Sequence, residues 1–443
     1  MLSLPYPTSS LCIKALFSIC LFINLNSNAQ EQRPNIIYIM TDDMGYADLS
    51  CYGGNYYSTP NIDKLASQGI KFLNAYSGAP ICTPTRVSFM TGRYPARTEV
   101  GLFEPLRGNQ RDSLIGLKPE QTSVATLVKN AGYETALIGK WHMGFLPPHN
   151  PNANGFTEFF GFHSGAVDYI RHVNPRLTPD LYHNATPVNR EGYFTDIITQ
   201  EAVQYVKKKH SKPFFLSLQF NAPHWPWQGP GDKPYQDTMN WTAGGSKAVF
   251  RAMMESLDSA VGVVLKAVDD AGLFQNTVIF FTNDNGGERY SDMGIYSGHK
   301  AQLLDGGIRV PAFIRWPGKI KPNSSTTQVA ITMDWTATIL AIAGAKPDPS
   351  FPLDGLNLLE ICTGTKKVFD RTLYWRITQV GNQRAIRDGN WKYLKTEQGE
   401  FLFDLAADPS EKNDLKEKSP NVFQRLQSKY AEWEKTVLKP IPL

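Results

Sequence analysis

Several features that mark common protein classes are scarce or missing in this chain. It has no block of lysines and arginines and no acidic run, and its formal net charge is only +4 over 443 residues. This pattern argues against nucleic-acid binding and against a charged, disordered tail. Internal repeats and low-complexity linkers are also missing, so a repeat architecture is not expected. The apolar content of 42% is ordinary for a soluble globular protein.

Long apolar runs are missing too, with one partial exception near the N-terminus. The run at residues 15–25 is too short to cross a bilayer, which takes roughly 20 apolar residues. Lys14 precedes this run and the small residues Ser27-Asn28-Ala29 follow it, as in the core and cleavage region of a signal peptide. We therefore predict a signal peptide over residues 1–29, a periplasmic or secreted mature protein, and no stable insertion into a membrane.

Cysteine is scarce, with five in the whole chain. Cys12 and Cys20 fall inside the predicted signal peptide, which leaves Cys51, Cys82 and Cys362 in the mature protein. Because three is an odd number, at least one thiol is unpaired in an oxidising compartment. Whether Cys51 and Cys362 pair with each other stays open.

Apolar strands that end in polar, reactive residues recur along the chain. The four segments are residues 35–40, followed by Asp42 and Asp43; residues 135–138, followed by Lys140 and His142; residues 214–220, followed by His224; and residues 277–281, followed by Asp284 and Asn285. Residues 312–316 form a fifth candidate strand, and residues 59–66, 122–132 and 251–269 have the spacing or end signals of helices. This alternation predicts an α/β fold with a large, mostly parallel sheet sandwiched by helices.

The polar residues after these strands are expected to converge, because ligands of such sheets bind beyond the carboxyl ends of the strands. Asp42, Asp43, Asp284 and Asn285 offer hard oxygen ligands, which suit calcium or magnesium better than zinc. Taken singly, each pair also fits a turn or a helix cap. A surplus of cationic and histidine side chains surrounds them and indicates a tetrahedral anion as guest. This second set consists of Arg86, Lys140, His142, His224 and Lys300.

One motif carries more information than any other, namely Cys82-Thr-Pro-Thr-Arg-Val-Ser-Phe-Met-Thr-Gly-Arg93. It holds a nucleophile-sized side chain on a turn stiffened by proline, with the permanent cation of Arg86 one helical turn away. Such a cation lowers the pKa of a nucleophile or holds an anion. A buried structural cysteine before a helix is the alternative interpretation.

This motif resembles the signature of type I sulfatases, which belong to the alkaline phosphatase superfamily. Further phrases resemble family motifs in the same order: residues 132–142, Ala222-Pro-His224-Trp-Pro226, Asn283-Asp-Asn-Gly286, Gly298-His-Lys300 and residues 305–311. The resemblance covers roughly residues 35–311 and is nearest to arylsulfatase A and N-acetylgalactosamine-6-sulfatase types. Asp305 departs from the family pattern, where glutamate is common, and we expect an effect on loop packing more than on chemistry.

The resemblance implies a mechanism and roles for the site residues. Cys82 would be oxidised to formylglycine by a formylglycine-generating or anaerobic maturation enzyme, and the hydrated aldehyde would attack the sulfur of a sulfate ester. Asp42, Asp43, Asp284, Asn285 and the modified Cys82 would hold one Ca²⁺; Arg86 would hold the hydrate; Lys140 and Lys300 would bind sulfate oxygens; His142 would deprotonate the second hydroxyl; and His224, with Lys300, would protonate the leaving alcohol.

The substrate is less well defined by the sequence. Export and the resemblance together favour a sulfated carbohydrate. Residues 145–196 either line a pocket or form a surface insertion, and Trp225 and Trp227 either stack on a sugar ring or simply pack. Two alternative functions remain. A phosphatase or phosphodiesterase of the same superfamily would ordinarily carry serine or threonine at position 82, and a non-catalytic relative would bind sulfated glycans without turnover.

The C-terminal part of the chain has a different pattern. Residues 371–377, 384–394 and 400–405 have the composition of short strands joined by turns at Asp388-Gly389 and Gln398-Gly399. Residues 420–438 have the pattern of one amphipathic helix. We therefore predict a catalytic α/β domain over residues 30–365 and a C-terminal subdomain over residues 366–443, built from a small antiparallel sheet and a helix.

Overall fold

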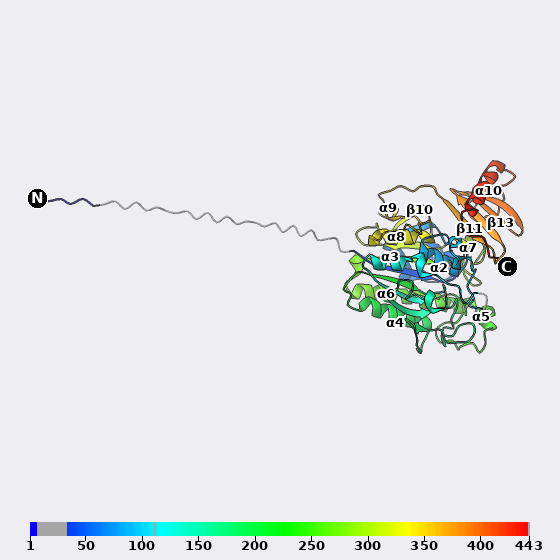
Figure 1. Ribbon diagram of the computed structural model, residues 1–443, viewed down its shortest axis with the longest axis horizontal. Helices are drawn as coiled ribbons and strands as arrows, with labels where there is room; N and C mark the ends of the chain where they lie inside the picture. The colour runs from blue at the N-terminus through cyan, green and yellow to red at the C-terminus, as the bar shows by residue number, and fades with distance from the viewer. Residues whose placement is uncertain (7–32, 110–111, 442–443) are drawn as a thin grey trace. The chain divides into compact units, whose positions relative to one another are not determined.

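The computed structural model of the chain describes residues 1–6, 33–109 and 112–441 (Figure 1). The predicted signal peptide lies outside the described residues, except for residues 1–6. From Arg33 onward the chain forms one compact unit. Among the helices of the described ranges, none is long and apolar enough to span a bilayer.

A ten-stranded sheet runs through the described part of the chain and is mostly parallel, as predicted. In spatial order its strands are β10 (Ser324–Ile331), β2 (Ile70–Tyr76), β9 (Ala312–Arg315), β8 (Thr277–Asn283), β1 (Asn35–Thr41), β7 (Phe214–Gln219), β3 (Glu134–Lys140), β4 (Glu158–Phe162), β5 (Tyr182–His183) and β6 (Thr186–Pro187). Strand β9 runs antiparallel to both of its neighbours, and so do β5 and β6 at the other edge. The five strands expected from the sequence are all present.

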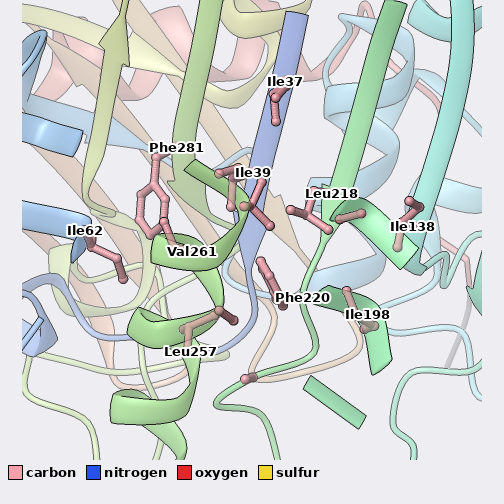
Figure 2. Packing of buried hydrophobic residues seen from close by; sticks show 14 of the residues in the cluster. Ile37, Ile39, Ile62, Ile138, Ile198, Leu218, Phe220, Leu257, Val261 and Phe281 are labelled. Atoms are coloured by element: carbon pink, nitrogen blue, oxygen red, sulfur yellow. The ribbon is translucent and has the colours of Figure 1, made fainter. Parts of the chain in front are cut away.

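Helices cover both faces of this sheet, which is why its central strands are apolar on both sides. Along β1 the side chains alternate: Ile37 and Ile39 enter one core, and Ile36 and Tyr38 enter the other. Figure 2 shows Ile37 and Ile39 facing the side chains of α6. The first face is covered by α1 (Pro60–Ser67), α4 (Phe194–Lys207) and α6 (Lys247–Asp270), and the second by α2 (Cys82–Thr91), α3 (Val124–Asn130), α8 (Thr332–Ala343) and α9 (Leu359–Cys362).

A second sheet follows near the C-terminus, and it matches the predicted small antiparallel sheet. Its strands are β11 (Thr372–Ile377), β12 (Gln383–Asp388), β13 (Trp391–Thr396) and β14 (Gly399–Asp404). Helix α10 (Pro420–Glu434) contributes Leu426, Tyr430 and Trp433 to a third core shared with this sheet. The predicted boundary at 365/366 falls between α9 and β11, inside the compact unit, and stays a prediction.

Two further α-helices of the described residues are short: α5 (Asn240–Ala243) and α7 (Asp305–Ile308). The three described cysteines are all free thiols, so Cys51 and Cys362 do not form a disulfide. Cys362 is buried in α9, and Cys51 is partly buried.

Candidate active site

Four adjacent strands deliver most of the predicted site. In the order β8, β1, β7 and β3 they run parallel, so their carboxyl ends meet at one edge. The chain continues from β8 into Asp284 and Asn285, from β1 into Asp42 and Asp43, from β7 toward His224, and from β3 into His142, directly after Lys140. All seven side chains are at most 3% exposed. The predicted convergence at one rim is confirmed by their mutual contacts.

Arg86 lies at the centre of this rim and is itself buried. Its guanidinium donates to Oδ2 of Asp284 over 2.9 Å and to Oε1 of Gln219 over 2.9 Å, and lies 3.6 Å from Oδ2 of Asp42. Burial disfavours the charge, but the two carboxylates outweigh it and raise the pKa of Arg86. The arginine is therefore a permanent internal countercharge for the carboxylates.

Cys82 stands at the first position of α2, one turn before Arg86. Burial raises the pKa of the Cys82 thiol above its usual range, and the ammonium groups of Lys140 and Lys300 offset this only in part. Of the two roles that the sequence analysis considered for the cation of Arg86, holding an anion stays a prediction, and no lowering of the pKa of Cys82 is found, because burial dominates and Arg86 is engaged with Asp284. An unmodified thiol here is protonated and a weak nucleophile.

The carboxylates are held by contacts from several elements. Asp43 has a left-handed backbone, with φ at 62°, which turns the chain sharply after β1. Its Oδ1 accepts from Asn285 Nδ2 over 2.7 Å, and its backbone N–H donates to Oδ1 of Asp284 over 3.2 Å. Burial opposes ionisation, yet Lys300 and His224 lower the pKa of Asp43. Burial and Asp42 raise the pKa of Asp284 to about 7, against the pull of Arg86.

This set of oxygens fits a hard divalent cation. Ligand atoms of Asp42, Asp43 and His224 lie within 4.8 Å of one another. Oδ1 of Asp42 and Oδ1 of Asn285 are buried and accept no hydrogen bond. Buried oxygens without donors are costly unless a cation satisfies them, and carboxylate and amide oxygens are typical calcium ligands. His224 belongs to the same group, although the sequence analysis did not include it among the metal ligands.

Two histidines present neutral rings to the site. Nε2 of His142 lies 2.9 Å from the carbonyl oxygen of Leu106, so this nitrogen carries the proton. Nδ1 of His142 is then an acceptor, and it is buried without a partner. Nδ1 of His224 contacts the carbonyl of Trp225, and its Nε2 lies 3.5 Å from Oδ2 of Asp43. Burial, with Lys140 for His142 and Lys300 for His224, lowers the pKa of both rings well below the usual value.

The two lysines each pair with one carboxylate. Nζ of Lys140 lies 2.5 Å from Oδ2 of Asp42, and Nζ of Lys300 lies 2.5 Å from Oδ2 of Asp43 and 3.5 Å from Oε2 of Glu288. Lys140 is fully buried, whereas the side chain of Lys300 is 15% exposed. Lys300 is therefore the lysine that a bound ligand reaches directly.

A cavity of about 1140 Å³ opens over the rim. Cys82, His142, His224 and Lys300 line it, whereas Arg86 and Lys140 lie behind them and are not part of its wall. The sequence analysis gave all four lining residues a direct role on the ester, but it gave one to Lys140 as well, as a ligand of sulfate oxygens. The geometry thus separates residues that face a substrate from residues that hold the carboxylates.

The cavity also decides two questions that the sequence left open. Residues 145–196 do line it in part, and His163 is among the lining residues. Five other ionisable residues of this segment do not line it: His149, Asp168, Arg171, His172 and His183. Trp225 lines the cavity, whereas Trp227 is 3% exposed and packs edge-on against Tyr290. Only Trp225 is placed to meet a sugar ring.

Sequence reasoning missed two side chains that hold the site. Gln219 orients Arg86 and Glu288 contacts Lys300. A polar glutamine at the end of the apolar strand β7 was a usable signal, because it breaks the run where the other strands present site residues. Glu288 gave no such signal, since a charged residue in a loop is usually solvated.

Comparisons with known proteins agree with this geometry. Residues 34–345 match the family model described as Sulfatase, and residues 294–436 match that described as N-sulphoglucosamine sulphohydrolase, C-terminal. The chain is similar to human N-acetylgalactosamine-6-sulfatase, with 31% identity over 79% of this chain and 70% of the relative. It is also similar to the N-acetylgalactosamine-6-O-sulfatase of Bacteroides thetaiotaomicron, with 30% identity over 91% of this chain and 94% of the relative.

Among solved structures, the chain resembles Ps i-CgsB in complex with k-i-k-neocarrahexaose. The TM-score is 0.84 at 31% identity, covering 92% of this chain and 94% of that chain. The family model alone spans well over half of the sequence and includes every predicted site residue from Asp42 to Lys300. The chain therefore belongs to the type I sulfatase family and is a sulfuric ester hydrolase.

Proposed function

We propose that this protein is an exported sulfatase that removes sulfate from a sulfated glycan, through a formylglycine made from Cys82. One observation carries the proposal: Cys82, His142, His224 and Lys300 line the same cavity, directly over the buried carboxylates. The raised pKa of the Cys82 thiol supports a role for the modified residue rather than for a free thiolate. A formylglycine hydrate supplies the hydroxyl that attacks sulfur and a second hydroxyl whose deprotonation releases sulfate.

We further propose that Ca²⁺ binds at the rim. Asp42, Asp43, Asp284 and Asn285 would hold it, and the two oxygens without donors, on Asp42 and Asn285, support this assignment. A bound divalent cation supplies positive charge that stabilises the sulfate group as it is transferred. Lys140 and Lys300 then balance the carboxylates from the other side.

The chain's own residues divide the proton transfers between two sides of the cavity. Nδ1 of His142 is fixed as an acceptor, because its other nitrogen donates to the carbonyl of Leu106, and it suits a general base. On the other side, Nε2 of His224 and Nζ of Lys300 approach the same oxygen of Asp43. This arrangement suits protonation of the leaving alcohol by the ammonium group of Lys300, because the neutral ring of His224 carries its proton on Nδ1, which faces the carbonyl of Trp225. Lys300 also orients the sulfate group from the wall of the cavity.

Two observations and one prediction support a glycan substrate. The relatives named above are sulfatases of an amino sugar, and the similar solved structure contains an oligosaccharide. Trp225 offers an aromatic face inside the cavity. The predicted signal peptide fits a large extracellular substrate better than a cytosolic metabolite.

The proposal is tested by a peptide mass and a turnover assay together. The tryptic peptide of residues 72–86, from a host competent for the modification, is expected to show formylglycine at position 82. The same protein is expected to release sulfate from a panel of sulfated sugars, and Cys82→Ala is expected to release none while folding normally. Unmodified cysteine in a competent host, or turnover of phosphate esters alone, would instead favour the phosphatase alternative. Glycan binding without turnover would favour the non-catalytic alternative.

A further inference from the structure

The mouth of the cavity carries arginines that the mechanism does not use. Arg107, Arg176 and Arg289 all line the cavity, and all three are exposed. They come from three separate segments: the loop before α3, the segment between β4 and β5, and the loop after β8. Three segments distant in sequence thus bring the same charged group to one opening.

None of these guanidinium groups is neutralised within the described residues. Arg107 and Arg176 make no side-chain hydrogen bond or ion pair there. Arg289 donates to the backbone carbonyls of Thr242 and Ala243, over 3.4 and 2.9 Å, so its orientation is fixed while its charge stays free. By contrast, Arg171, on the same segment as Arg176, lies 3.6 Å from Asp168 and does not line the cavity.

The acidic residues of the cavity wall are already engaged. Both carboxylate oxygens of Asp180 accept backbone N–H groups, from His163 and Ser164, each over 3.0 Å. Glu288 lies 3.5 Å from Lys300. The wall thus holds the cations Arg107, Arg176, Arg289 and Lys300 against the carboxylates of Asp180 and Glu288, so a surplus of positive charge remains. Such a surplus favours an anionic ligand there.

The size of the cavity also favours a ligand larger than a single sulfated sugar. Its volume of about 1140 Å³ is larger than the roughly 300–1,000 Å³ typical of pockets for single small ligands. Cys82, His142 and His224 are almost fully buried, at 2–3% exposure, whereas the three arginines are exposed. A sulfate ester held at Cys82 thus leaves room, toward the mouth, for neighbouring sugar units.

We infer that Arg107, Arg176 and Arg289 form an anion-binding rim that selects oligosaccharides carrying a second sulfate or carboxylate beside the scissile ester. The inference rests on the proposed function, because it names the substrate class of that same site. Each exposed contact is weak alone, and three together give a measurable preference. The rim acts on binding and not on the chemical step.

The test uses the mature chain with Cys82→Ala, so that binding is measured without turnover. The probes are three polysulfated hexasaccharides, prepared from carrageenan, chondroitin sulfate and heparin, together with their desulfated counterparts. Calorimetry compares the protein with Arg107, Arg176 and Arg289 intact against the triple variant R107Q/R176Q/R289Q. The matched control is Arg251→Gln, which removes an exposed arginine of α6 that does not line the cavity and makes no side-chain ion pair among the described residues.

At least one hexasaccharide is expected to bind the triple variant about 10- to 100-fold more weakly than the parent, and Arg251→Gln is expected to match the parent. The difference should shrink at high salt, because exposed charges are screened. The substitution of all three arginines by lysine should restore much of the affinity. Desulfated probes should not distinguish the proteins.

Two results would contradict the proposed anion-binding rim: equal affinity of the parent and the triple variant for all three hexasaccharides, or failure of the parent to bind any of them. Because Arg289 contacts backbone carbonyls, the double variant R107Q/R176Q gives the same test without touching it. Turnover separates the two proposals. Sulfate release by the Cys82 protein with an indifferent triple variant contradicts the rim alone, whereas arginine-dependent binding without any sulfate release contradicts the proposed function alone.

Discussion

Two groups of buried charges in this protein look alike and behave differently. The first, here the cavity cluster, consists of Asp42, Asp43, Asp284, Arg86, Lys140, Lys300 and His224. The second, the interior cluster, consists of Asp305, Glu411, Lys392, Arg309 and Tyr76. Both place carboxylates and cations together at low exposure. Only the cavity cluster contributes to the wall of the cavity.

In the interior cluster both carboxylates have cationic partners. Nζ of Lys392 lies 2.7 Å from Asp305 and 2.7 Å from Glu411, and the hydroxyl of Tyr76 donates to Asp305 over 2.8 Å. The other oxygen of Glu411 accepts the backbone N–H of Asp305. Each carboxylate oxygen thus faces a donor or a cation, although Oε1 of Glu411 meets Lys392 without a hydrogen bond and Nε of Arg309 has no partner. In the cavity cluster, Oδ1 of Asp42 has no donor, and the ion pairs of Asp42 with Arg86 and Lys140 are on its other oxygen. The contrast indicates that every carboxylate oxygen of the interior cluster has a partner, whereas the cavity cluster has room for a further cation.

The largest expected effect comes from a change in the cavity cluster. Asp42→Asn removes charge from an oxygen that no donor satisfies, so it should weaken calcium binding and lower kcat/KM for sulfate release about 10³-fold. Turnover and the rise of Tm on addition of calcium measure the two effects. Chelation with EDTA should lower the Tm of the parent protein but not that of the variant. A variant that keeps both the calcium-dependent Tm rise and activity within tenfold would contradict the assignment.

A change in the interior cluster should act on stability instead. Lys392→Met leaves two buried carboxylates without their shared cation, which should cost about 3–5 kcal/mol of the free energy of unfolding. Urea unfolding measures the loss, and turnover of the folded protein at low temperature should stay near that of the parent. Lys395→Met is the matched control, because Lys395 lies on the same strand but pairs with Glu400 at the surface. It should cost no more than about 1 kcal/mol, and equal losses for both variants would contradict this contrast.

The interior cluster also makes stability depend on pH. Burial raises the pKa of Glu411 from its ordinary 4.5 to about 7, despite Lys392. Between these values the folded protein keeps a proton that the unfolded chain has released, so this stabilising contribution is present below pH 4.5 and is lost as the pH rises through 7. At about 1.4 kcal/mol per pKa unit the loss reaches at most about 3.5 kcal/mol.

Glu411→Gln tests this dependence, because it keeps an acceptor for the N–H of Asp305 and cannot ionise. Urea unfolding of parent and variant at a series of pH values gives the difference in unfolding free energy. The stability of the variant relative to the parent should rise between pH 4.5 and 7. A difference that does not change with pH would show that Glu411 does not titrate in this range.

The two clusters also differ in how far the sequence predicts them. The cavity cluster was foreseen, because Asp42, Lys140, His224 and Asp284 follow apolar strands whose order forces their ends together. The interior cluster was not foreseen, since its members are 87 and 106 residues apart and each is an ordinary charged residue by itself. Asp305 was noticed only as a departure from the family pattern. Its partners, Lys392 on β13 and Glu411 after β14, can be identified only from the three-dimensional structure.

The same limit applies to the fold. Strand β1 was predicted because both faces are buried, which gives a continuous apolar run. Strand β10 was missed, because it is a polar edge strand whose burial alternates along Ser324–Ile331. Strand β2, between β10 and β9, was missed with it, since its mixed sequence gave no clear run. Arg107, Arg176 and Arg289 were missed for a related reason. They lie on loops, and the position of a loop residue in space cannot be predicted from a periodic sequence pattern.

The smallest expected effect separates position from charge within the cavity. Gly165 lies against His142, and a β-carbon there would stand 2.5 Å from the ring. Gly165→Ala should therefore displace the imidazole and lower kcat/KM about 10- to 100-fold while leaving the interior cluster and the Tm nearly unchanged. Gly229→Ala is the control, because its β-carbon would come no closer than 3.2 Å to any atom, that of Ala252, and would lie away from the cavity wall. A general base must lie within hydrogen-bond distance of the hydroxyl that it deprotonates. Normal turnover in Gly165→Ala would therefore contradict the assignment of His142 as the general base.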